Sequence, residues 1–93
     1  MAESRLDRVI VIESNPSGHR LYYVALLADA ARERGLVFEW WTCSAAQVSP
    51  EAEVHLGHRG VAVRLVETGV SRVGVLRMAL RDERAWVVIP DGD

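Results

Sequence analysis

The 93-residue sequence contains no lysine, and all eleven of its basic residues are arginine. Without lysine the chain cannot supply a Schiff-base amine, a P-loop lysine or a phosphoryl-sensing lysine. Its single cysteine, Cys43, excludes an internal disulfide and is typical of a reducing compartment. No apolar run has the length of a membrane span, and the first residues lack the apolar core of a signal peptide. We therefore expect a cytoplasmic protein.

The net charge of the chain excludes two classes of partner, and its length predicts a single small domain. The net charge is −2, and acidic and basic residues are interleaved along the chain. Bulk charge therefore attracts neither nucleic acid nor a membrane surface. A chain of this length forms one small domain that buries only about 60–65% of its unfolded surface, so its core is thin.

One stretch, residues 8–35, organises the chain. Val9 to Ile12 are four consecutive aliphatic residues, the pattern of a strand buried on both faces in a parallel sheet. Pro16 ends that strand because proline has no amide hydrogen for the ladder. A helix follows, and Gly35 is its expected stop. The loop between them lies at the carboxyl end of a central strand, where open α/β sheets bind their ligands.

Strands and helices alternate along the whole chain. The expected strands are Arg8–Glu13, Val37–Thr42, Val61–Val66 and Trp86–Ile89, and the expected helices run from about His19 to Arg34, Pro50 to Leu56 and Ser71 to Arg84. With right-handed crossovers, this alternation favours an α/β fold with a Rossmann-like open parallel sheet of order 3-2-1-4. The fourth strand is as apolar as a central strand but lies at the edge of that order. We therefore interpret residues 1–93 as a partial, truncated amino-terminal Rossmann-like domain.

Side-chain patterns predict which faces are buried. Trp40 and Trp41 are neighbours on one strand and must point to opposite faces of the sheet. Ser49 is the expected cap of the helix that begins at Pro50. The last helix is expected to bury a stripe formed by Val73, Leu76 and Leu80. That helix alone covers one face of the sheet, so we expect bare Val, Ile and Trp side chains there and self-association of the chain, through that face or the fourth strand.

The loop Ser14-Asn-Pro-Ser-Gly-His carries the candidate binding groups, which are Ser14, Asn15, Ser17 and Gly18. Free amide groups at a helix N-terminus favour an anion, and the hydroxyls can hold a phosphate or a sugar hydroxyl. The alternative is an ordinary strand–helix turn in which Ser17 is the N-cap. A dinucleotide site is a poor match, because the loop lacks spaced glycines and the second strand is not followed by the ribose-binding acid.

His19 ends this loop and is the candidate catalytic residue. A neutral imidazole there can take a proton from a substrate hydroxyl as a general base. The alternative is a solvent-exposed histidine in the first turn of a helix. His55 and His58 lie three residues apart but lack a third ligand, so we expect no metal site. Cys43 is expected to be a small buried residue rather than a nucleophile, because no histidine adjoins it in the sequence.

These residues resemble a known family. The run from Val9 through Ser17-Gly-His-Arg-Leu to the helix that ends at Gly35 is similar to the first βαβ unit of two-domain, GT-B-type glycosyltransferases. The chain departs from that family in having no glycine pair in the loop, and in having Tyr22 where some relatives have proline. The resemblance implies a nucleotide-sugar held mainly by a second domain, with this domain lining the acceptor side. It also implies that His19 matches the catalytic base of some members.

The resulting functional hypothesis is the acceptor-side fragment of a glycosyltransferase that moves a sugar from a nucleotide-sugar to an acceptor hydroxyl. His19 is the catalytic candidate, and Ser14, Asn15, Ser17 and Gly18 are the substrate-binding candidates. We expect no cofactor, and the isolated chain is expected to be inactive. The alternative is a small non-catalytic Rossmann-like binding or regulatory module.

Overall fold

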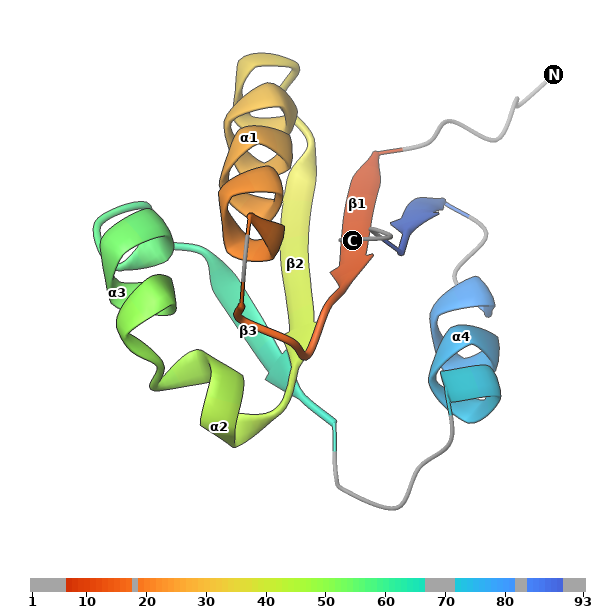
Figure 1. Cartoon of the computed structure of the whole chain (residues 1–93). Coiled ribbons are helices and arrows are strands. Elements are labelled where there is room, and N and C mark those ends of the chain that lie inside the picture. The colour runs from red at the N-terminus through yellow and green to blue at the C-terminus, as the bar shows by residue number, and fades with distance from the viewer. Residues whose placement is uncertain (1–6, 18, 67–71, 82–83, 90–93) are drawn as a thin grey trace, which may run out of the picture.

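The computed structural model describes residues 7–17, 19–66, 72–81 and 84–89. Along this part of the chain the elements are β1 (Arg8–Ile12), α1 (Arg20–Glu33), β2 (Val37–Thr42), α2 (Ser44–Gln47), α3 (Pro50–Leu56), β3 (Ala62–Leu65), α4 (Arg72–Leu80) and β4 (Ala85–Val88). All four of these strands join one parallel sheet of order β3-β2-β1-β4 (Figure 1). The predicted strand order is confirmed, and the fold is Rossmann-like. No helix among the described residues is long and apolar enough to cross a membrane.

β1 is the central strand and positions the loop that follows it. It pairs with β2 on one side and with β4 on the other. Val9, Ile10 and Val11 are at most 5% exposed, as the unbroken aliphatic run predicted. Burying each of these side chains contributes about 1.5–3 kcal/mol of transfer free energy. The carboxyl end of β1 is therefore held firmly, and so is the start of the loop.

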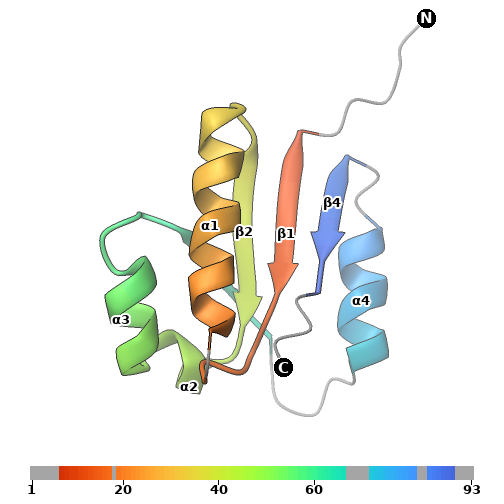
Figure 2. The same cartoon turned by 45° about the horizontal axis from the view of Figure 1, so that its top comes forward.

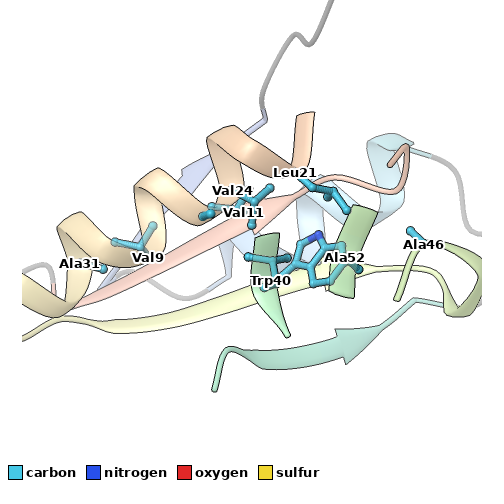
Figure 3. Close-up of a cluster of buried hydrophobic side chains, with 10 residues drawn as sticks. Val9, Val11, Leu21, Val24, Ala31, Trp40, Ala46 and Ala52 are labelled. Carbon is cyan, nitrogen blue, oxygen red and sulfur yellow. The ribbon is translucent and has the colours of Figure 1, made fainter. Parts of the chain in front are cut away.

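Different helices cover the two faces of the sheet. α1 and α3 lie beside each other on one face, which we call the α1 face, and α4 lies near β4 (Figure 2). The core of the α1 face includes Val9, Val11, Leu21, Val24 and Trp40 (Figure 3). The core of the opposite face holds Ile10, Trp41, Val75 and Ala79. The two tryptophans therefore do point to opposite faces, as strand alternation predicted.

The sheet face opposite α1 is closed by polar contacts as well as by α4. The guanidinium carbon of Arg64 lies 4.5 Å from the ring centroid of Trp41, a cation–π arrangement. The indole nitrogen of Trp41 donates to Glu39 Oε1 at 2.9 Å, and Arg8 donates to Glu39 Oε2 at 3.0 Å. Trp41 is only 3% exposed, and Ile10 only 1%. The prediction of bare Ile and Trp side chains on this face is therefore wrong for these two residues, because Arg64 and α4 cover them.

α4 differs from its predicted extent and orientation. It ends at Leu80 rather than Arg84, because the chain must return to begin β4 at Ala85. Val75 and Ala79 are buried, whereas Leu80 is 58% exposed. The predicted stripe is therefore wrong at Leu80, and the small side chain of Ala79 lets the helix approach the sheet. The predicted cap Ser71 and the side chain of Val73 lie outside the described residues.

Smaller differences concern the other elements. The predicted bounds of the second strand and of the helix at Pro50 are confirmed, and Ser49 Oγ accepts a hydrogen bond from the Ala52 amide at 3.1 Å. β3 is shorter than predicted, at four residues, whereas β4 has the predicted length of four residues but begins and ends one residue earlier. The single-turn helix α2 was not predicted, because four residues are too few to show a helical period.

An ion pair ties α1 to the turn that follows α3. Arg59 Nε donates to Asp29 Oδ1 at 3.1 Å, and the same guanidinium donates to the carbonyl of His55. The hydrogen bond from Arg59 holds the pKa of the Asp29 carboxyl below its usual value. Both side chains are partly exposed, so the pair contributes little to stability. The pair links α1 to the turn after α3, in agreement with the contact between these two helices.

Gly35→Ala is expected to lower the free energy of unfolding by about 1–2 kcal/mol. Gly35 ends α1 with a φ of +69°, in the left-handed region that a Cβ makes unfavourable. An added Cβ would meet no atom within 4 Å, so the cost is backbone strain alone. Urea unfolding measures the change, and Gly35→Asn is the control because asparagine tolerates this conformation better. An alanine variant as stable as the wild type would contradict the prediction.

Candidate functional site

The predicted binding loop lies at the carboxyl ends of β1 and β2, in front of the N-terminus of α1. Ser14, Asn15 and Ser17 are exposed, as the sequence hypothesis requires of ligand-binding groups. His19 is also exposed and occupies the N-cap position of α1. The loop thus brings these four candidates to one edge of the sheet. The fifth candidate, Gly18, lies outside the described residues.

Asn15 organises the polar side chains of the loop. Its Oδ1 accepts a hydrogen bond from the Ser17 amide at 2.9 Å and another from the Ser17 hydroxyl at 2.7 Å. This is an Asx turn, in which an asparagine side chain replaces a backbone acceptor. Ser17 is therefore engaged with Asn15, and the N-cap position falls to His19, whose side chain makes no capping hydrogen bond. The interpretation of Ser17 as N-cap is wrong for this reason.

Glu13 is the main polar group beneath the loop, and it follows β1, which ends at Ile12 rather than at Glu13 as predicted. Its amide donates to the Trp41 carbonyl at 3.0 Å, and its carbonyl accepts from the indole nitrogen of Trp40 at 2.8 Å. Its Oε2 accepts from the Asn15 amide at 3.1 Å. The residue is only 8% exposed. A carboxylate this buried is unusual unless it is paired or used, so we add Glu13 to the candidate site residues.

Two buried oxygen atoms at this edge accept no hydrogen bond from any described residue. They are Glu13 Oε1 and Thr42 Oγ1, and Thr42 is 2% exposed. The register that pairs Ile12 with Trp41 brings Glu13 level with Thr42 on the adjacent strand. Alternation places both side chains on the α1 face, the face of Val11 and Trp40. Leaving such groups unsatisfied costs about 1–3 kcal/mol each, so a water or a ligand group is expected beside each of them.

The charge of Glu13 is partly balanced by the first residue of α1. Arg20 Nε lies 3.8 Å from Glu13 Oε1, a distance that permits an ion pair but is too long for a hydrogen bond. The free amides at the N-terminus of α1 favour a negative charge nearby. Glu13 supplies such a charge from within the chain. The edge thus combines a buried carboxylate with exposed hydroxyl, amide and imidazole groups, a set that suits a ligand with several hydroxyls.

Cys43 and His55 add no ligand-binding or catalytic group to this edge. Cys43 is half-buried, and its Sγ lies 3.6 Å from the Ser14 carbonyl, so it contacts the loop as a small packing residue. His55 is on α3, where its ring contacts that of Tyr22 with centroids 5.9 Å apart. Among the described residues, no group of three or more His, Cys, Asp or Glu side chains is placed to hold a metal ion.

The site was only partly visible in the sequence. The loop could be predicted because Pro16 ends the first strand and the glycine before His19 allows the turn into the first helix. Glu13 was missed, although an acidic residue directly after four aliphatic ones was a signal that could have identified it. Thr42 was missed because its position beside Glu13 depends on strand pairing. A comparison of the chain with protein-family models, curated proteins and solved structures finds no match.

Proposed function

We propose that this domain forms the acceptor side of a glycosyltransferase, with the loop at residues 14–19 binding the acceptor and His19 acting as general base. The observation that carries the proposal is the exposed His19 imidazole at the N-cap of α1, on the same edge as the exposed Ser14, Asn15 and Ser17. Parallel α/β sheets bind ligands at this edge. The resemblance of Ser17-Gly-His-Arg-Leu to the loop of GT-B-type enzymes gives the reaction class.

In the proposed reaction this domain supplies a general base and the groups that bind the acceptor. The neutral His19 imidazole takes the proton of an acceptor hydroxyl while that oxygen attacks the anomeric carbon of the donor sugar. The bond from that carbon to the phosphate oxygen breaks, and the nucleoside diphosphate leaves with the bonding electron pair. Hydroxyl and amide groups of Ser14, Asn15 and Ser17 hold the other hydroxyls of the acceptor in place. The nucleotide-sugar itself is bound mainly outside this domain, as the resemblance implies.

A second candidate function is a non-catalytic Rossmann-like binding module that uses the same loop. One observation favours it: the His19 side chain makes no capping hydrogen bond at the N-terminus of α1 that would orient its ring. Catalytic bases are commonly oriented by a third group, which can become ordered only when the substrate binds. The two candidates therefore share the ligand site and differ in whether His19 contributes to turnover.

The isolated chain is expected to bind nucleotide-sugars more weakly than about 10 μM, or about −7 kcal/mol. The loop lacks the spaced glycines that let a backbone approach a diphosphate, and the Glu13 carboxylate lies beneath it. Calorimetric titration with UDP- and GDP-sugars provides the test. Tighter binding would show that the donor site lies in this domain after all.

We also propose that the chain self-associates through β4. This strand pairs with β1, and no other described strand pairs with its outer edge. It carries no charged residue, while Trp86 and Ile89 are 47% and 41% exposed. Uncharged edges of this kind are templates for pairing with another strand, most simply a second copy across a two-fold axis. Sedimentation velocity at micromolar concentration should show a dimer that Trp86→Lys dissociates. A wild-type monomer would refute the proposal.

A further inference from the structure

We propose that Glu13 determines the ligand specificity of the loop by excluding phosphate and other anions, so that the ligand bound there is an uncharged, hydroxyl-bearing molecule. The exclusion of anions is argued from the burial and the contacts of Glu13 and does not depend on the proposed function. Only the identification of that ligand as a sugar acceptor rests on the proposed function.

The carboxylate of Glu13 occupies the place that a bound anion would otherwise take. Amide groups of a strand–helix loop and of a helix N-terminus are the usual ligands of phosphate in α/β folds. In this loop the Asn15 amide already donates to Glu13 Oε2 at 3.1 Å. The other oxygen, Oε1, lies 3.8 Å from Arg20 Nε, in the first turn of α1. The Glu13 carboxylate is therefore an anion of the chain itself, held against the loop amide that would otherwise bind a ligand.

Burial makes this charge effective at a distance. Glu13 is 8% exposed, and its Oε1 accepts no hydrogen bond from the described residues. A charge that water screens poorly acts over a longer range than a charge on the surface. A phosphate approaching the N-terminus of α1 would meet this repulsion before it could gain any amide contact. Electrostatic repulsion of this kind is a common means of rejecting the wrong ligand.

The same groups favour an uncharged ligand over a cation. A cationic ligand would be repelled by the positive charge of the Arg20 guanidinium and by the positive end of the α1 helix dipole. Thr42, level with Glu13 on the adjacent strand, offers a hydroxyl that can donate or accept a hydrogen bond. The exposed groups of Ser14 and Asn15 are also neutral. A molecule with several hydroxyls matches this set of neutral partners.

The decisive experiment compares phosphate binding by the wild-type chain and by Glu13→Gln. Backbone amide chemical shifts of Asn15, Ser17 and Leu21 are followed by NMR as inorganic phosphate is added at constant ionic strength. The wild type should show no saturable shift. Glu13→Gln, which keeps the side-chain shape and removes the charge, should bind phosphate at least about tenfold more tightly. Glu33→Gln, at the opposite end of α1, is the control for net charge and should behave as the wild type.

Each outcome of this comparison decides the proposal. A saturable phosphate site at the loop of the wild type would overturn it, whether or not Glu13→Gln folds. A folded Glu13→Gln variant that also fails to bind phosphate would overturn it too, because Glu13 would then have only a structural role. Methyl α-D-glucoside serves as the uncharged probe, and Glu13→Gln should bind it no more tightly than the wild type does. Absence of sugar transfer by the full-length protein would refute the proposed function and leave the phosphate result standing.

Discussion

For the glycosyltransferase that we propose, His19→Ala is expected to lower kcat for sugar transfer by about 10²–10⁴-fold, the usual contribution of a general base. The melting temperature should stay nearly unchanged. The imidazole of His19 is exposed and makes no capping hydrogen bond, so its removal breaks no described contact of the folded state. A large kinetic effect without a structural one is characteristic of a residue that acts on the substrate.

The measurement compares steady-state rates and thermal unfolding of the same preparations. His58→Ala is the matched control, since His58 is also exposed but lies beyond α3, away from the loop. Wild-type turnover by His19→Ala would show that the histidine has no chemical role, and would favour the non-catalytic binding module.

Trp40→Ala is expected to destabilise the domain by about 3–5 kcal/mol. A chain of this length has a total stability of roughly 5–14 kcal/mol, so the variant should be close to unfolding. The Trp40 side chain is 2% exposed and lies in the α1-face core with Val11, Leu21 and Ala52 (Figure 3). Its truncation leaves a cavity that neighbouring side chains can fill only in part.

The same substitution should also disturb the site. The indole nitrogen of Trp40 donates to the Glu13 carbonyl at 2.8 Å, so this side chain fixes the backbone where the loop begins. Trp40→Phe removes the hydrogen bond and keeps most of the volume, and should therefore cost less than Trp40→Ala. Tyr23→Ala is the exposed aromatic control and should change stability by less than about 0.5 kcal/mol. Urea denaturation provides the comparison, and a Trp40→Ala variant with wild-type stability would contradict the described packing.

Local patterns in the sequence determined most of the fold. The unbroken run from Val9 to Ile12 identified the central strand, and the end of α1 at Gly35 followed from glycine's tolerance of positive φ. Ser49 before a proline marked the start of α3. Each of these signals depends on residues within one or two turns of one another. The strand order followed as well, because right-handed crossovers leave few topologies for alternating strands and helices.

Tertiary structure alone decided the buried face of α4 and the chemistry beneath the loop. The apolar pattern of α4 left its buried side open, and in the folded chain Val75 and Ala79 face the sheet while Leu80 is exposed. Glu13 and Thr42 are 29 positions apart in the sequence and become neighbours only when β1 pairs with β2. A pattern along one strand carries no information about the residue opposite it. The sequence therefore determined the exposed loop of the candidate site, whereas strand pairing placed the buried carboxylate and hydroxyl next to each other.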